Sequence, residues 1–196
     1  MAELAAALAT VLATVAAIPQ LLRVARAGDG RGVSVTSAVL GIGSELAWVM
    51  YATQAGLWSA LPEAGLMAAG NTILAIALLR RHASARGALP AGLAWLGALT
   101  TIAVLGGTTA LGAVLGVTYA VQIARAVWTV WRTSSPSGVA ASTWAMIGAE
   151  GVLWGAYGLH HGDVAVLTFA ATATFAATAT LARKLQVARL AQPAVS

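Results

Sequence analysis

The chain has 196 residues, of which 59% are apolar and only 9% are charged, and its formal net charge is +5. About a quarter of the residues of a soluble domain are charged, so a chain this apolar could not cover its own surface in water. The absence of cysteine excludes disulfides, thiolate metal sites and thiol catalysis. The cations are scattered at the ends of apolar segments and form no basic stripe, so nucleic acid is not an expected partner.

Seven apolar stretches are long enough, or nearly so, to cross about 30 Å of hydrocarbon as helices. The connections between them are short, which makes neighbouring helices antiparallel. The sequence therefore predicts an all-α membrane protein with seven transmembrane helices. We expect the basic tail after Leu181 to fray. The predicted helices are Leu4–Leu22, Val33–Ala55, Leu61–Leu79, Leu89–Leu105, Thr109–Trp131, Val139–Leu159 and Val164–Leu181.

The Lys and Arg residues fall into four clusters, in alternate loops or at the helix ends beside them. An excess of cations marks the cytoplasmic loops of membrane proteins. We therefore expect a multi-pass protein of the plasma (inner) membrane, with the N-terminus outside and the C-terminus in the cytoplasm. The clusters are Arg23/Arg26/Arg31, Arg80/Arg81/Arg86, Arg125/Arg132 and Arg183/Lys184/Arg189.

The sequence contains an internal repeat of three helices. Three crossings end on the opposite face, so one extra helix between the repeats restores a parallel orientation, as in known transporters. We expect a first triple-helix bundle over residues 1–82, a linker helix over 83–107, a second bundle over 108–184 and a cytoplasmic tail over 185–196. A shift of 102 residues pairs Gln20 with Gln122 and Arg23 with Arg125, and a shift of 106 pairs Gly32 with Gly138, Val33 with Val139, Trp48 with Trp154, Tyr51 with Tyr157 and Gly56 with Gly162.

These motifs resemble those of the PQ-loop superfamily and, within it, of the SWEET and SemiSWEET transporters. The resemblance implies two triple-helix bundles joined by an inversion linker helix. It also implies alternating-access transport of a small polar solute, in the family typically a sugar. The residues that carry it are Pro19-Gln20, Gly32-Val33-Ser34, Trp48-x-x-Tyr51 and Trp154-x-x-Tyr157-Gly158.

The sequence departs from the family pattern in two respects. The second repeat has Val121-Gln122, and of the four hinge prolines that the resemblance implies only Pro19 is present. The inner hinge would then comprise Pro19, Gln20 and Gln122. The family's sugar-binding Asn is missing from its expected place on the third helix of each repeat, and Asn71 lies near enough to that place to substitute.

Glu45 and Glu150 lie near the centre of the second helix of each repeat. An ionised carboxylate is costly there, so such residues face a cavity or the bundle interior, and burial favours the neutral form. Either residue would serve proton coupling or solute binding, or else would join helices through a hydrogen bond to Ser44 or to a backbone carbonyl. Glu150 is the stronger candidate because Trp154 lies one turn away on the same face.

The predicted central site combines aromatic walls with polar groups. Tryptophan rings stack on sugar faces or bind cations, although anchoring at the membrane interface is the alternative reading. The amide of Asn71 suits solute hydroxyls, and helix association is an equal alternative. The substrate-binding candidates are Ser44, Trp48, Asn71, Glu150, Trp154 and Thr172, with Glu45 as a further member, and the outer gate comprises Tyr51, Tyr157 and Asp163.

The sequence thus predicts a SWEET-like facilitator of a small polar solute, with a sugar as the expected substrate class. The first alternative is a proton-coupled carrier of an amino acid or organic cation that uses Glu45 and Glu150. The second is a non-transporting membrane receptor or scaffold on the same fold. No nucleophile–base constellation appears, so we expect no enzyme, no catalytic residue, no cofactor and no metal site. The expected partners are the solute and the lipid bilayer, and a homo-oligomer is left open.

Overall fold

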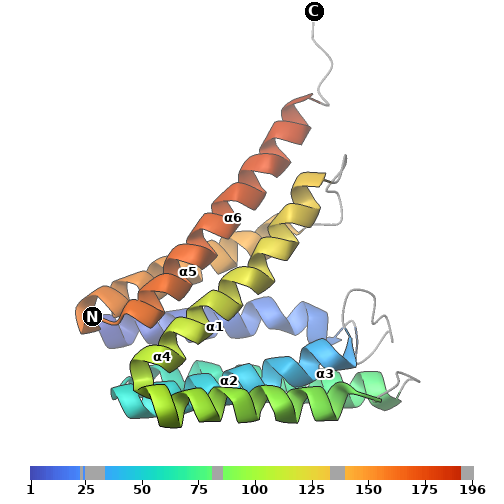
Figure 1. Ribbon diagram of the computed structural model, residues 1–196. Helices are drawn as coiled ribbons and strands as arrows, with labels where there is room; N and C mark the ends of the chain where they lie inside the picture. The colour runs from blue at the N-terminus through green and yellow to red at the C-terminus, as the bar shows by residue number, and fades with distance from the viewer. Residues whose placement is uncertain (23, 25–33, 81–85, 133–139, 191–196) are drawn as a thin grey trace, which may run out of the picture. The chain divides into compact units, whose positions relative to one another are not determined.

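The computed structural model describes residues 1–22, 24, 34–80, 86–132 and 140–190. Within these ranges every regular element is helical and no strand occurs, which confirms the all-α prediction. The helices, shown in Figure 1, are α1 (Ala2–Leu22), α2 (Val35–Ala55), the short 3₁₀ helix η2 (Trp58–Ala60), α3 (Leu61–Arg80), α4 (Ala88–Arg132), α5 (Ala141–His161) and α6 (Val164–Leu190).

Five of the described helices are long and apolar enough to cross a membrane: α1, α2, α3, α4 and α6. Large apolar side chains along them are exposed, for example Leu105 at 82% and Val117 at 62%. Such surfaces are unfavourable in water and ordinary in contact with lipid. These properties are those of a multi-pass membrane protein.

The helix bounds differ from the predicted ones mainly at the C-terminal end. α6 continues to Leu190 and does not end at Leu181, so the expected fraying of the tail is wrong as far as Leu190. The extension consists mostly of good helix formers, and a hydrogen bond from Arg183 Nη1 to Gln186 Oε1 (3.0 Å) links successive turns. The predicted helix starts Val33 and Val139 lie outside the described residues.

The chain forms two units that we describe separately. The first-repeat unit comprises residues 13–115, and the second-repeat unit comprises residues 1–12 and 116–196. The first-repeat unit contains α2, α3 and the first part of α4, which run side by side in Figure 1. Its core cluster consists of Val24, Val35, Ala38, Leu74, Ala75, Leu78 and Ala88.

The first part of α4 packs closely on α2. A Cβ at Gly92 would overlap the side chain of Val39, and a Cβ at Gly43 would lie 3.2 Å from Cδ1 of Trp95. Small residues at such crossings let helix backbones approach, which is the main source of helix association in lipid. The segment predicted as the linker helix is therefore an integral part of the packing of the first-repeat unit.

α4 is interrupted at Gly107, where φ is 68° and ψ is −170°. This conformation is essentially restricted to glycine. Close packing accounts for the preceding glycine, Gly106, since an added Cβ there would lie 2.5 Å from Cβ of Ala110. The two glycines predicted to separate the fourth and fifth helices are thus the place where the backbone leaves the helical region.

α5 and α6 pack along a seam of small residues in the second-repeat unit. On α5 the seam consists of Gly148, Gly151, Gly155 and Gly158, and on α6 each of these faces Ala177, Thr174, Ala170 or Leu167. The buried face of α6 is largely alanine, with Ala170 and Ala173 at 3% and 0% exposure. The alanine richness of the sequence is used here for close helix packing.

The two repeats end their second helices in the same way. α2 and α5 each span 21 residues, and each ends at a left-handed glycine, Gly56 with φ 73° and Gly162 with φ 65°. In both, the next residue donates a backbone hydrogen bond back across the cap, from Leu57 N to Ala52 O (2.8 Å) and from Asp163 N to Gly158 O (2.9 Å). This is the Schellman pattern. The 106-residue repeat therefore extends to backbone geometry.

Candidate functional site

The Trp-x-x-Tyr motif has the same side-chain geometry in both repeats. The rings of Trp48 and Tyr51 meet edge to face, with centroids 5.6 Å apart and an interplanar angle of 88°. Trp154 and Tyr157 repeat this arrangement at 5.3 Å and 89°. Edge-to-face contact is a favoured geometry for aromatic pairs. Each unit thus holds a preformed aromatic pair one turn before its glycine cap.

The two aromatic pairs differ in exposure. Tyr51 is buried and Trp48 is half-buried, whereas Trp154 and Tyr157 are only 4% and 1% exposed. Glu150, one turn before Trp154, is buried as well, at 8%. The second-repeat unit therefore buries a carboxyl group and two aromatic rings along α5, and a role of Glu150 in proton coupling or solute binding stays a prediction.

Asp163, predicted as an outer-gate residue, caps α6. Its Oδ1 accepts a hydrogen bond from the backbone N of Val166 at 2.9 Å. A carboxylate at a helix N-terminus satisfies a free N–H group and interacts favourably with the helix dipole. This contact gives Asp163 a structural role, and a gate role stays a prediction.

His161 belongs to the last turn of α5 and connects this helix with the start of α1 in the second-repeat unit. Its ring lies 4.4 Å from that of Tyr157, and its Nε2 lies 3.4 Å from Oε1 of Glu3 near the start of α1. The sequence suggested no partner for Glu3, because residues this far apart in the chain meet only in the tertiary structure.

Ser44, predicted to bind substrate, is engaged by the first part of α4. The indole Nε1 of Trp95 donates a hydrogen bond to Ser44 Oγ at 3.0 Å. The same indole packs against Gly43, where an added Cβ would lie 3.2 Å from Cδ1 of the ring. The sequence assigned no role to Trp95, because the partner of this side chain on α2 is decided only by tertiary packing.

Asn71, predicted as a substitute for the family's binding Asn, lies at the crossing of α3 and α2. A Cβ added at Gly41 would lie 2.8 Å from Asn71 Nδ2. The amide thus occupies the space that the glycine leaves open. This contact matches the helix-association reading of Asn71.

Glu45, the predicted counterpart of Glu150, is half-buried on α2. Glu63, at the start of α3, lies near enough to interact electrostatically with its carboxyl group. A role of Glu45 in proton coupling stays a prediction.

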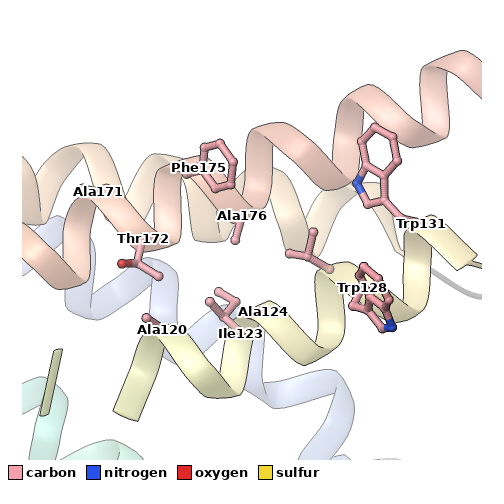
Figure 2. Close-up of a pocket in the computed structure, with 10 residues that line it drawn as sticks. Ala120, Ile123, Ala124, Trp128, Trp131, Ala171, Thr172, Phe175 and Ala176 are labelled. Atoms are coloured by element: carbon pink, nitrogen blue, oxygen red, sulfur yellow. The ribbon is translucent and has the colours of Figure 1, made fainter. Parts of the chain in front are cut away.

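Thr172 is the predicted site residue that lines a cavity. An apolar groove of about 680 Å³ runs between the second part of α4 and α6 (Figure 2), and we call it the α4–α6 groove. In Figure 2 Thr172 and Ala120 lie toward one end, and Trp128 and Trp131 toward the other. The lining residues are Ala120, Ile123, Ala124, Val127, Trp128, Trp131, Ala171, Thr172, Phe175 and Ala176.

The predicted inner hinge is described in part. Pro19 lies inside α1 and is exposed, and Gln122 is exposed on α4. The backbone of Gln20 is helical, and its side chain lies outside the described residues. A proline inside a helix removes one backbone hydrogen bond and favours a kink, which is compatible with a hinge.

The described residues hold no cluster of three or more potential metal ligands. The predicted site residues form local groups within each unit: Trp48 with Tyr51, Trp154 with Tyr157, Ser44 with Trp95, and Asn71 with Gly41. Glu150 is buried on the same helix as Trp154 and Tyr157. A comparison with models of known protein families gives no match for the chain, and no curated protein is significantly similar to it.

Proposed function

We propose that the chain is a SWEET-like, alternating-access membrane transporter of a small polar solute, with a sugar as the first substrate class to test. The observation that carries the proposal is the repetition, at an offset of 106 residues, of an edge-to-face Trp–Tyr pair followed by a left-handed glycine cap. Internal repeats with aromatic and polar groups near mid-membrane are typical of secondary transporters.

The proposed topology has seven crossings arranged as two triple-helix bundles and a linker helix. Its support is α4, whose 45 residues would extend for about 67 Å as a straight helix, against about 30 Å of hydrocarbon. The non-helical Gly107 divides it into two lengths that each suit one crossing. With α1, α2, α3 and α6, and with α5 taken as a further crossing although it falls outside the five most apolar helices, this makes seven.

Flux through proteoliposomes tests the proposal. The purified chain is reconstituted and screened with labelled sugars and amino acids, with and without a pH gradient. Trp48→Ala should lower flux two- to tenfold, because a lost aromatic contact is worth about 0.5–1.5 kcal/mol. Trp58→Ala is the matched control, because Trp58 lies in the short helix η2 and is 64% exposed. This substitution should leave flux unchanged. Saturable binding without flux would indicate a receptor or scaffold instead.

The buried Glu150 supports a second candidate, a proton-coupled carrier of an amino acid or organic cation. The carboxyl group of Glu150 is 8% exposed in a largely apolar helix, and carboxyl groups within membrane helices commonly mark ion pathways and proton relays. Under this candidate, uptake responds to a pH gradient and is lost in Glu150→Gln. Glu3→Gln, which removes an exposed carboxylate in the first turn of α1, should retain coupled uptake. Gradient-independent uptake in both variants would contradict coupling.

A further inference from the structure

The α4–α6 groove ends at two tryptophans, and the guanidinium group of an arginine lies over the ring of each. The guanidinium of Arg132 lies 4.4 Å from the ring centroid of Trp128, and that of Arg183 lies 5.7 Å from the ring of Trp131. Trp131 belongs to α4 and Arg183 to α6, so the second contact links the two walls of the groove. A guanidinium over an indole face is held by the ring quadrupole and keeps its edge N–H groups for other partners. Of these groups, Nη1 of Arg183 donates to Gln186 Oε1.

The positive charge at this end of the groove has no acidic counterpart nearby in the sequence. Between Gly116 and Ser196 the chain contains only two acidic residues, Glu150 and Asp163. Glu150 is buried at mid-helix, and Asp163 caps the opposite end of α6. In addition, the buried Nε of Arg183 has no hydrogen-bond partner in the described part of the chain. The groove end therefore complements an anion.

The length of the groove corresponds to one leaflet of the bilayer. Its α4 wall runs from Ala120 to Trp131, which is roughly 16 Å at 1.5 Å per residue. Half of the hydrocarbon thickness is about 15 Å. The volume of about 680 Å³ is within the range of sites that hold small organic ligands. Apart from the hydroxyl of Thr172 and the indole nitrogens, the lining side chains are aliphatic or aromatic. A polar solute has little to bind here.

We propose that the α4–α6 groove binds one anionic phospholipid, with an acyl chain between α4 and α6 and its phosphate at Arg132 and Arg183. Basic pockets between transmembrane helices at a cytoplasmic surface are known to hold anionic headgroups. Apolar contact along the groove fixes the chain, and the two arginines select the charge of the headgroup. Lipid binding here does not depend on transport, although Thr172, a substrate-binding candidate, lines one end of the groove.

Native mass spectrometry of the full chain in detergent tests the proposal. The probes are phosphatidylglycerol and phosphatidylcholine with identical acyl chains, added to delipidated protein. We expect one phosphatidylglycerol to bind more tightly than phosphatidylcholine. The double variant Arg132→Gln/Arg183→Gln should lose about fivefold in affinity for each arginine removed and approach the affinity for phosphatidylcholine. Arg125→Gln removes an exposed arginine of the same helix that is not part of the two arginine–tryptophan contacts, and it should retain the preference.

A second pair of variants tests the groove itself. Ala124→Phe fills the groove and should lower binding of both lipids, whereas Ala126→Phe, at an exposed position of α4 outside the groove, should not. Equal affinity for the two lipids in the unmodified chain would overturn the proposal, and so would undiminished binding in Ala124→Phe. Displacement of the lipid by glycerol 3-phosphate would overturn it in favour of a site for a free anion. A dimer that Ala124→Phe abolishes would identify the groove as an interface between copies. Because binding is measured without flux, this result and the transport result can each fail alone.

Discussion

Single glycines set the distance between helices in this protein. Gly151 is the tightest position of the α5–α6 seam, since an added Cβ would lie 2.5 Å from Thr174 Oγ1 and 3.0 Å from the backbone oxygen of Ala170. At Gly155 the nearest atom would be Cβ of Ala170, at 3.7 Å, which is ordinary contact. The two glycines look alike in the sequence and differ in the structure.

Gly151→Ala should therefore destabilise the second-repeat unit by about 1–3 kcal/mol, because the backbone of α6 must move to accept the methyl group. Gly155→Ala is the control and should be neutral or slightly stabilising, because alanine is the better helix former. Thermal unfolding in detergent measures both. Equal melting temperatures of the two variants would show that the seam is looser than described.

The Trp95–Ser44 hydrogen bond is the polar link between α4 and α2 at this crossing. Hydrogen bonds between membrane helices contribute about 0.6 kcal/mol on average and at most about 1.7. A double-mutant cycle with Ser44→Ala and Trp95→Phe should give a coupling energy in this range. If Ser44 instead bound the transported solute, Ser44→Ala would reduce flux and the cycle would show no coupling in stability.

At the scale of the helix, the interruption of α4 depends on a backbone conformation at Gly107 that is essentially restricted to glycine. Gly107→Ala forces a Cβ into a backbone region of about 1–3 kcal/mol strain. Gly97→Ala, in the straight first part of α4 with open space around it, is the matched control and should stabilise the helix. We expect lower stability only in Gly107→Ala, measured by thermal unfolding. No difference between the two variants would mean that the interruption is not required.

α2 and α5 show that a repeat can preserve the end of a helix while its start diverges. Ser34 caps the start of α2, since its Oγ accepts a hydrogen bond from Ser37 N at 3.0 Å. Ala140, at the equivalent place before α5, makes no side-chain cap. Both helices end in the same glycine cap. The end that supports the Trp–Tyr pair is thus the more similar one.

At the scale of the whole molecule, the proposed topology predicts on which side of the membrane each loop and each chain end lies. Because the chain has no cysteine, single cysteines can report accessibility without background. Seven crossings place Gln54→Cys, His160→Cys and a cysteine added before Met1 on the outer side, and Leu190→Cys on the inner side. An impermeant maleimide applied to intact cells should label the first three only. Labelling of both chain ends from one side would contradict an odd number of crossings.

The sequence by itself determined the helical class, the membrane character, the helix bounds to within a few residues at most ends, and the interruption at Gly106–Gly107. These follow from local causes: the length of apolar runs, the position of charges, and the conformational freedom of glycine. The repeated Trp–Tyr motif was also visible, and its side-chain geometry followed from a three-residue spacing within one helix.

Only the tertiary structure decided which polar groups are engaged. Ser44 bonds Trp95, Asn71 fills the space over Gly41, and Asp163 caps α6, so these candidates hold the fold whether or not they meet a solute. The α4–α6 groove was equally hidden, because its residues read as ordinary apolar helix in the sequence. Helix faces are periodic in sequence, but the choice of partner for each face depends on small differences in packing between many apolar surfaces, and that choice is made only when all the helices are assembled.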